Sequence, residues 1–276
     1  MIRGPSSASR RFRVAAVQMV SGPDPAANCA AADALIGEAA ARGAMLVVLP
    51  EYFPQIGASE QDKIALREKD GVGPLQDFLS QAAARHRVWL VGGSLPLEAS
   101  VPDKIRNACL VYDDQGRRVA RYDKLHLFGF EHGAERYNES ATIEPGTAVA
   151  SFDSPLGRVG LSICYDLRFP ELYRALGAVN LICVPAAFTQ TTGEAHWELL
   201  LRARAVENQC YLVAAAQGGT HPGGRVTYGD SMIVDPWGVV LDRLAKGPGV
   251  ATAEIDLDRI GSVRASLPAL AHRRLP

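Results

Sequence analysis

Short apolar runs alternate with helical patterns along almost the whole chain. Apolar runs that are too short for a helix and are bounded by polar or turn residues predict β-strands. The strands expected from this pattern cover residues 13–19, 45–49, 88–92, 108–112, 118–122, 158–163, 181–184, 211–216, 230–234, 239–244 and 250–255. Helical patterning predicts helices at residues 25–42, 75–87 and 195–208, and a further helix that begins at Pro170 and Glu171.

Capping and turn residues support several of these boundaries. Asp24 directly before Pro25 is typical of an N-cap followed by proline at the first helical position. Gly43 ends the same helix, because glycine readily adopts the left-handed conformation found after helix ends. Two pairs of strands are predicted as hairpins, one turning at residues 114–116 and the other at 236–238.

The alternation of strands and helices predicts an α/β fold in which helices cover the sheets. Residues 13–50 and 158–185 share one order of strand, helix and strand. These similar halves predict two stacked sheets related by pseudo-twofold symmetry. Since no low-complexity segment or linker divides the chain, we expect one domain over residues 12–276 and a disordered tail over residues 1–11.

Composition narrows the class of protein. Hydrophobic residues make up 47% and charged residues 21% of the 276 residues, which suffices for a full core. The formal net charge of -1 argues against a nucleic-acid partner, and no apolar run is long enough to cross a membrane. The five cysteines form no CxxC pair, so they indicate neither a metal site nor disulfides, and reduced thiols are typical of a cytoplasmic protein.

Three chemically reactive side chains stand at predicted strand ends, where α/β folds place their sites. They are Glu51, Lys124 and Cys164. Glu51 could accept the thiol proton, and Lys124 could stabilise the thiolate and then an oxyanion, so we expect a depressed pKa at Cys164. Taken singly, each has a structural alternative: Glu51 could simply end a strand, Lys124 could be solvated, and Cys164 could be a small core residue like Cys183 and Cys210.

The sequences around these residues resemble one family. LPE at 49–51, KLHLF at 124–128 and CYDLRFPEL at 164–172 are similar to motifs of the carbon–nitrogen hydrolases, the nitrilase superfamily. The order Glu, Lys, Cys is the signature of that superfamily. The resemblance runs from about residue 13 to residue 274, nearly the whole chain.

The resemblance implies a fold and a set of catalytic roles. The family has an αββα sandwich fold, pairs into homodimers whose layers stack, and uses neither a metal nor an organic cofactor. By resemblance, Glu51 is the general base, Lys124 the oxyanion stabiliser and Cys164 the nucleophile of an amidase. The backbone N–H of Tyr165 is then the second oxyanion donor, and the partner is a small amide substrate.

Related enzymes use a second glutamate near the site. YNES at 137–140 matches that segment of the family, so Glu139 is the expected residue. Glu131 and Glu135 are rivals in the same loop, and either could be a surface acid.

The residues after the nucleophile indicate the branch of the family. Cys164-Tyr165-Asp166 resembles the group of deaminated glutathione amidases and ω-amidases, and the segments at 195–221, 231–238 and 267–274 favour the first of these. The expected activity is therefore hydrolysis of deaminated glutathione through a thioester, releasing a carboxylate and an amine or ammonia. The alternatives are an ω-amidase acting on 2-oxoglutaramate or 2-oxosuccinamate, a nitrilase, and a scaffold without catalysis.

Two departures from that group concern the substrate. Asp230 stands where the group usually has histidine, and the loop at residues 129–136 is longer than in close relatives. Loops decorate a pocket while the catalytic residues stay fixed, so both departures bear on which amide is bound.

Four further residues are candidates for substrate binding. Phe188, Thr189 and Thr192 follow a predicted strand end, where they either line the pocket or form a strand-to-helix turn. Arg168 either binds a substrate carboxylate or pairs with a nearby acid. His126 lies two residues after Lys124 and leaves a Cys–His protease as a minor alternative.

Overall fold

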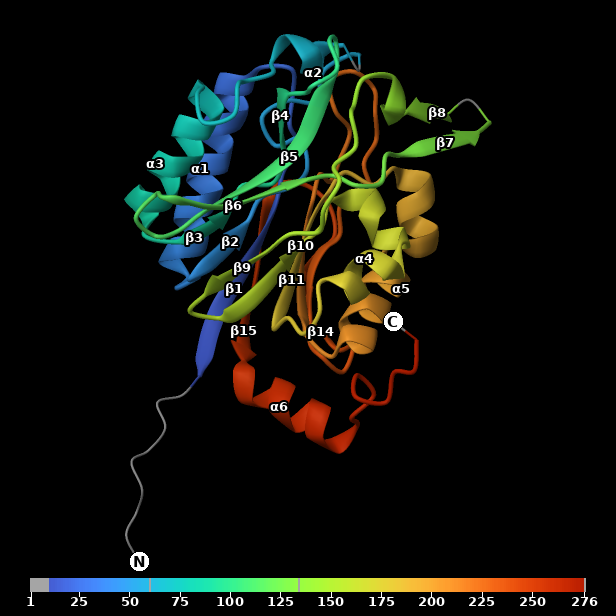
Figure 1. Cartoon of the computed structure of the whole chain (residues 1–276). Helices are drawn as coiled ribbons and strands as arrows, with labels where there is room; N and C mark the ends of the chain where they lie inside the picture. The colour runs from blue at the N-terminus through green and yellow to red at the C-terminus, as the bar shows by residue number, and fades with distance from the viewer. Residues whose placement is uncertain (1–9, 60, 134, 276) are drawn as a thin grey trace, which may run out of the picture.

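The computed structural model describes residues 10–59, 61–133 and 135–275 (Figure 1). Its strands are β1 (Arg11–Gln18), β2 (Leu46–Val48), β3 (Trp89–Val91), β4 (Leu95–Glu98), β5 (Ile105–Tyr112), β6 (Arg118–Asp123), β7 (Gly129–His132), β8 (Glu135–Asn138), β9 (Ser151–Ser154), β10 (Gly157–Leu161), β11 (Leu181–Ala186), β12 (Tyr211–Ala216), β13 (Ser231–Val234), β14 (Val240–Leu244) and β15 (Gly249–Asp256). Its α-helices are α1 (Pro25–Ala41), α2 (Asp62–Ala65), α3 (Pro74–His86), α4 (Pro170–Ala175), α5 (Gln190–Asn208) and α6 (Leu257–Ser266), and its 3₁₀ helices are η1 (Glu139–Ala141) and η2 (Cys164–Arg168).

Two mixed sheets form the centre of the molecule. The first has the order β15-β1-β2-β3-β5-β4, with β6 paired to β5, and the second has the order β14-β13-β12-β11-β10-β9. Strand β1 contacts β12 and β13, so the sheets stack face to face. Helices α1 and α3 cover the outer face of the first sheet, and α4 and α5 cover that of the second (Figure 1). The predicted αββα sandwich is confirmed.

The internal repeat is also present in the structure. Strands β1 and β2 lie parallel, with Val14 opposite Leu46, and α1 connects them. Strands β10 and β11 lie parallel in the second sheet and are connected by α4. As predicted, the Asp24 side chain caps α1 by accepting hydrogen bonds from backbone N–H groups. Each half therefore contributes one strand–helix–strand unit to the sandwich.

Several elements differ from the sequence prediction. The structure has a C-terminal helix, α6, that the sequence analysis does not predict. Only Leu257, Ile260 and Val263 of this helix are buried, so its apolar pattern is sparse. Strands β4 and β9 are also additional. The long loop at 129–136 forms the antiparallel hairpin of β7 and β8, with Phe130 opposite Tyr137.

The first strand begins within the predicted N-terminal tail. Residues 1–9 of the predicted tail lie outside the described residues, so that part stays a prediction. Arg11, which falls within the predicted tail, already pairs with Asp256 at the start of β1. The single domain expected over residues 12–276 likewise stays a prediction.

Gly93, between β3 and β4, lies against the backbone of Pro50, the residue directly before Glu51. Its φ of +59° is left-handed, and a Cβ at this position would lie 2.2 Å from the Pro50 carbonyl oxygen. Gly43 has a similar φ of +82°, but a Cβ there would meet nothing within 4 Å. Alanine at Gly43 would therefore suffer backbone strain alone, whereas alanine at Gly93 would suffer both strain and a steric clash.

We predict that Gly93→Ala destabilises the protein more than Gly43→Ala does. Left-handed strain alone costs about 1–2 kcal/mol, and the clash with Pro50 adds to it only in Gly93→Ala. Denaturant unfolding of both variants and the wild type measures the difference. Equal losses of unfolding free energy in the two variants would contradict a tight approach between Gly93 and Pro50.

Candidate active site

The ends of three strands bring the predicted catalytic residues together. Glu51 follows β2, Lys124 follows β6, and Cys164 begins η2 shortly after β10. Their exposed fractions are 1%, 1% and 7%. The Lys124 Nζ lies 2.9 Å from Glu51 Oε1, and the Cys164 thiol lines the same pocket as the Glu51 carboxylate, whose charge acts on it. These residues are therefore in contact as one buried group.

Glu139 completes this group. The Lys124 ammonium donates to both of its carboxylate oxygens, at 3.0 and 2.8 Å. The Tyr52 hydroxyl donates to Oε1 at 3.1 Å and the Phe128 N–H donates to Oε2 at 2.7 Å. These contacts hold the Glu139 carboxylate against the Lys124 ammonium.

The rival glutamates lie elsewhere. Glu131 pairs with Arg136 on the exposed surface of the β7–β8 hairpin, and Glu135 accepts a hydrogen bond from Thr191. Of these three acids, the structure brings only Glu139 to Lys124.

Asn107 is a site residue that the sequence analysis does not predict. Its Nδ2 donates to Glu51 Oε1 at 2.9 Å, which is the oxygen that Lys124 also contacts. Among the described residues, both donors thus hold Oε1, and Oε2 remains available to take up the thiol proton. The available sequence signal is weak: Asn107 is a polar residue directly before the apolar residues 108–112 of β5.

The backbone at Cys164 is strained, and Asp166 supports it. Cys164 has a φ of +51°, which is unusual for a residue with a Cβ. The buried Asp166 carboxylate accepts hydrogen bonds from the Ile163 N–H at 2.9 Å and the Tyr122 hydroxyl at 2.6 Å. These bonds close the turn around Cys164 and tie it to β6, so the thiol is directed into the pocket.

His126 belongs to the same supporting network. Its Nδ1 lies 2.7 Å from Asp166 Oδ1, and its ring stacks on Phe169 with centroids 3.7 Å apart. His126 is not among the described residues that line the pocket beside Cys164. The structure therefore does not support the Cys–His protease alternative, because Glu51 and not His126 lies beside the Cys164 thiol.

The charges in the site stabilise one another. Burial by itself lowers the pKa of Lys124, but the carboxylates of Glu139 and Glu51 outweigh it and hold that pKa well above its ordinary value. Burial by itself raises the pKa of Glu139, but the ammonium groups of Lys124 and Lys63 hold it below its ordinary value. Lys124 is therefore a cation and Glu139 an anion at neutral pH.

The expected depressed pKa of Cys164 is wrong. Burial and the neighbouring Glu51 carboxylate raise the pKa of this thiol well above its ordinary value, although Lys124 and the Ala187 N–H oppose the rise. The expectation rests on the positive charge of Lys124, whereas burial and the negative charge of Glu51 have the larger effect. Cys164 therefore rests as a thiol, and the base must remove its proton during the attack.

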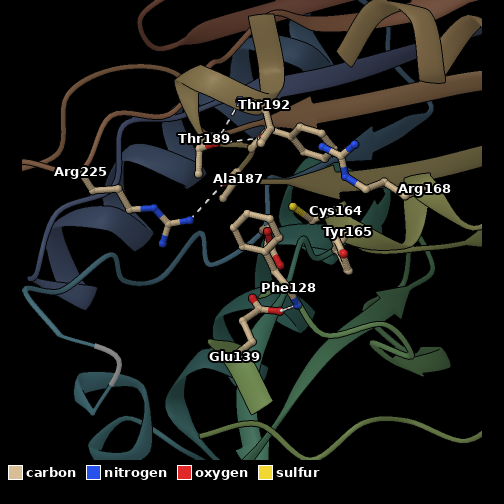
Figure 2. A pocket seen from close by; sticks show the side chains of 11 residues that line it. Phe128, Glu139, Cys164, Tyr165, Arg168, Ala187, Thr189, Thr192 and Arg225 are labelled. Atoms are coloured by element: carbon tan, nitrogen blue, oxygen red, sulfur yellow. Dashed lines mark hydrogen bonds between the residues drawn. The ribbon is translucent and has the colours of Figure 1, made fainter. Parts of the chain in front are cut away.

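A pocket opens above Cys164 (Figure 2). The four predicted binding residues, Phe188, Thr189, Thr192 and Arg168, all line it. Thr189 also caps α5, because its Oγ1 accepts a hydrogen bond from the Thr192 N–H at 3.2 Å. The pocket and turn interpretations of the two threonines therefore hold together.

Arg168 has no carboxylate partner among the residues that the structure describes. Its Nη1 donates to His196 Nδ1 at 3.2 Å, and its guanidinium lies 5.3 Å from the ring centroid of Phe188. The predicted structural ion pair is thus absent from the described part of the chain. The arginine faces the pocket from one side of Cys164 (Figure 2).

The pocket contains further residues that the sequence analysis does not predict. Phe128, Ala187 and Arg225 line it together with Tyr165. Arg225 lies across the pocket from Arg168, and its Nη2 donates to the Ala187 carbonyl at 3.2 Å (Figure 2). Its sequence context, between glycines and a threonine, gives no signal of this position.

The described residues contain no cluster of His, Cys, Asp or Glu suited to holding a metal ion. None of the helices described is both long and apolar enough to span a bilayer.

A buried thiol, carboxylate and lysine at the strand ends of an αββα sandwich define a class of hydrolytic enzyme. Residues 13–265 match the protein-family model of the carbon-nitrogen hydrolases. The chain therefore belongs to the carbon–nitrogen hydrolase family, and within that family it is an enzyme of the amidase type.

Individual relatives agree with this assignment. The chain is 41% identical to the deaminated glutathione amidase of Yersinia enterocolitica, over 96% of this chain and 94% of that one. It is 38% identical to the omega-amidase NIT2 of Xenopus tropicalis, over 96% and 95%. The crystal structure of the C. elegans NitFhit protein superimposes with a TM-score of 0.85 at 41% identity, covering 97% of this chain but only 66% of that fusion protein.

We predict that Glu139→Gln moves the alkaline limb of the pH–activity profile to lower pH. Without the Glu139 charge, the opposing effect of burial lowers the pKa of Lys124, so the ammonium is lost at lower pH. A shift of about one pH unit or more is expected for a close charge. Profiles of kcat/KM for Glu139→Gln and for the surface control Glu131→Gln measure it. A Glu139→Gln profile that superimposes on the wild type would contradict this role.

Proposed function

We propose that this amidase hydrolyses deaminated glutathione through a thioester on Cys164. The observation that carries the mechanism is the buried contact group of Glu51, Lys124 and Glu139 beside the thiol. The observation that supports the substrate is the identity of 41% to 43% with several relatives named deaminated glutathione amidase. This compound is 2-oxoglutarate joined through its distal carboxyl group to cysteinylglycine.

The first half-reaction forms the thioester. The Cys164 sulfur attacks the amide carbonyl carbon while Glu51 accepts the thiol proton. The oxyanion is stabilised by the Lys124 ammonium and the Tyr165 N–H, and one such donor is worth roughly 10²–10³ in rate. When the carbon–nitrogen bond breaks, Glu51 returns the proton to the nitrogen, and the amine departs.

The second half-reaction releases the acid. Glu51 takes a proton from water, whose oxygen attacks the thioester carbonyl carbon. The same two donors stabilise the new oxyanion. The carbon–sulfur bond then breaks, and the sulfur recovers a proton from Glu51. One carboxylate serves both halves because it is unprotonated again when the amine has left.

Arg168 is the proposed partner of the carboxylate on the acyl side of the substrate. It follows Cys164 in the same short helix, faces the pocket, and lacks an acidic partner among the described residues. A guanidinium can bind a carboxylate through two parallel hydrogen bonds. In this role, Arg168 favours amides whose acyl group carries a carboxylate.

The homodimer expected from the resemblance stays a prediction. Leu199 and Val206 on α5 are exposed, and so are Trp237 and Val239 beside the β13–β14 turn. Apolar side chains of this size on adjacent surface elements are typical of an interface.

We predict that Cys164→Ala abolishes turnover without loss of the fold. The substitution removes the nucleophile but only a few atoms of packing. Mass spectrometry of the wild type mixed with amide substrate is expected to detect the acyl thioester on Cys164. Circular dichroism tests folding, and Cys29→Ala is the control because that half-buried thiol lies outside the site. Retained activity in Cys164→Ala, or an acyl group on another cysteine, would contradict the mechanism.

We also predict a higher kcat/KM for deaminated glutathione than for 2-oxoglutaramate. The two amides share an acyl group, so they differ only in the leaving amine. Contacts to a charged leaving group are expected to favour deaminated glutathione by on the order of tenfold or more. A clear preference for 2-oxoglutaramate would instead identify the enzyme as an ω-amidase.

A further inference from the structure

Arg225 lines the catalytic pocket with a guanidinium group whose hydrogen-bonding capacity is only partly used by the described residues. Its Nη2 donates to the Ala187 carbonyl at 3.2 Å, and its guanidinium lies 5.4 Å from the ring centroid of Tyr137. Its Nε is buried and has no hydrogen-bond partner in the described part of the structure. A buried donor without an acceptor is costly, so this geometry suits a ligand that supplies one.

A groove extends from Arg225 away from Cys164. It has a volume of about 330 Å³, whereas the space directly beside the thiol is only about 10 Å³. The groove lining consists of residues from the α2 region, the β8 strand and the loop before β13: Ile56, Gly57, Ala58, Ser59, Lys63, Arg136, Tyr137, Asn138, Gly223 and Arg225. Of the two spaces that Arg225 lines, the groove is therefore the one with room for a large group attached to the reacting amide.

The charged side chains among the described lining residues of the groove are of one sign. Its described lining includes the cations Lys63, Arg136 and Arg225 and no carboxylate. Lys63 lies over the ring of Tyr52 with its Nζ 3.8 Å from the centroid, and Arg136 pairs with Glu131 at an exposed position. Arg225 is the cation shared by the groove and the catalytic pocket.

We propose that Arg225 and this cationic groove bind a carboxylate of the leaving amine. The inference rests on the proposed function and narrows its substrate class to amides with an anion on each side of the scissile bond. Arg168 and Arg225 lie on opposite sides of Cys164, so each can bind one anion (Figure 2). The acyl group must stay beside the thiol through both half-reactions, which leaves the wide groove for the amine that departs.

The test compares two amides that differ only at the far end of the leaving group. One is deaminated glutathione, and the other is the same compound with its glycine carboxylate replaced by a carboxamide. The measured quantity is the ratio of kcat/KM for the acid to kcat/KM for the carboxamide. It is determined for the wild type, Arg225→Gln, Arg225→Lys and the control Arg67→Gln, which removes a positive charge from an exposed residue outside the groove.

We expect the ratio to fall about 10-fold or more in Arg225→Gln, because a charge-assisted contact is lost. Arg225→Lys should recover part of the ratio, and Arg67→Gln should retain the wild-type ratio. A ratio that Arg225→Gln does not change, or that Arg67→Gln lowers equally, overturns the assignment of the groove. A wild-type enzyme that cleaves neither amide contradicts the proposed function and this inference with it.

Discussion

The buried ammonium of Lys124 is the interaction on which the site depends. Its side chain is fully buried, and such a cation is tolerated only because the Glu51 and Glu139 carboxylates lie within 3.0 Å of it. With Cys164 as a thiol, the group carries one negative charge. A resting thiolate would add a second negative charge at low dielectric, which explains why the pKa of Cys164 is raised rather than depressed. In the proposed attack, the proton moves to Glu51 while negative charge moves to the oxyanion, so the total charge stays constant.

The sandwich provides the rigidity that this balance requires. Glu51 and Lys124 extend from the first sheet, whereas Cys164 extends from the second, so the group forms only when the two sheets stack. Separate contacts fix each position: Asn107 holds Glu51 at 2.9 Å, and Asp166 holds the turn of Cys164. The left-handed φ of Cys164 persists because the surrounding hydrogen bonds determine it.

Much of this could be predicted from the sequence. Hydrophobic periodicity predicts the strands that form the core, and the short motifs around Glu51, Lys124 and Cys164 predict the reacting groups. The rest depends on contacts between distant segments, which have no local signal. Asn107 and Glu51 are far apart in the chain, and the charge state of Cys164 is set jointly by residues from three elements. Arg225 is in a glycine-containing loop whose position follows from packing and not from its own pattern.

The two expected departures from related amidases, Asp230 and the segment at 129–136, lie in different parts of the structure. Asp230 accepts hydrogen bonds from Arg243, and its backbone carbonyl accepts one from Trp197 at 2.7 Å. This residue supports α5 and is absent from the described pocket lining, so its side chain is not placed to contact a substrate there. The longer segment at 129–136 is different, because its hairpin contributes Arg136 to the cationic groove, beside Tyr137 of the same strand. In the proposed groove the hairpin therefore adds one cation to those of Lys63 and Arg225, while the catalytic group beneath it depends on the sandwich.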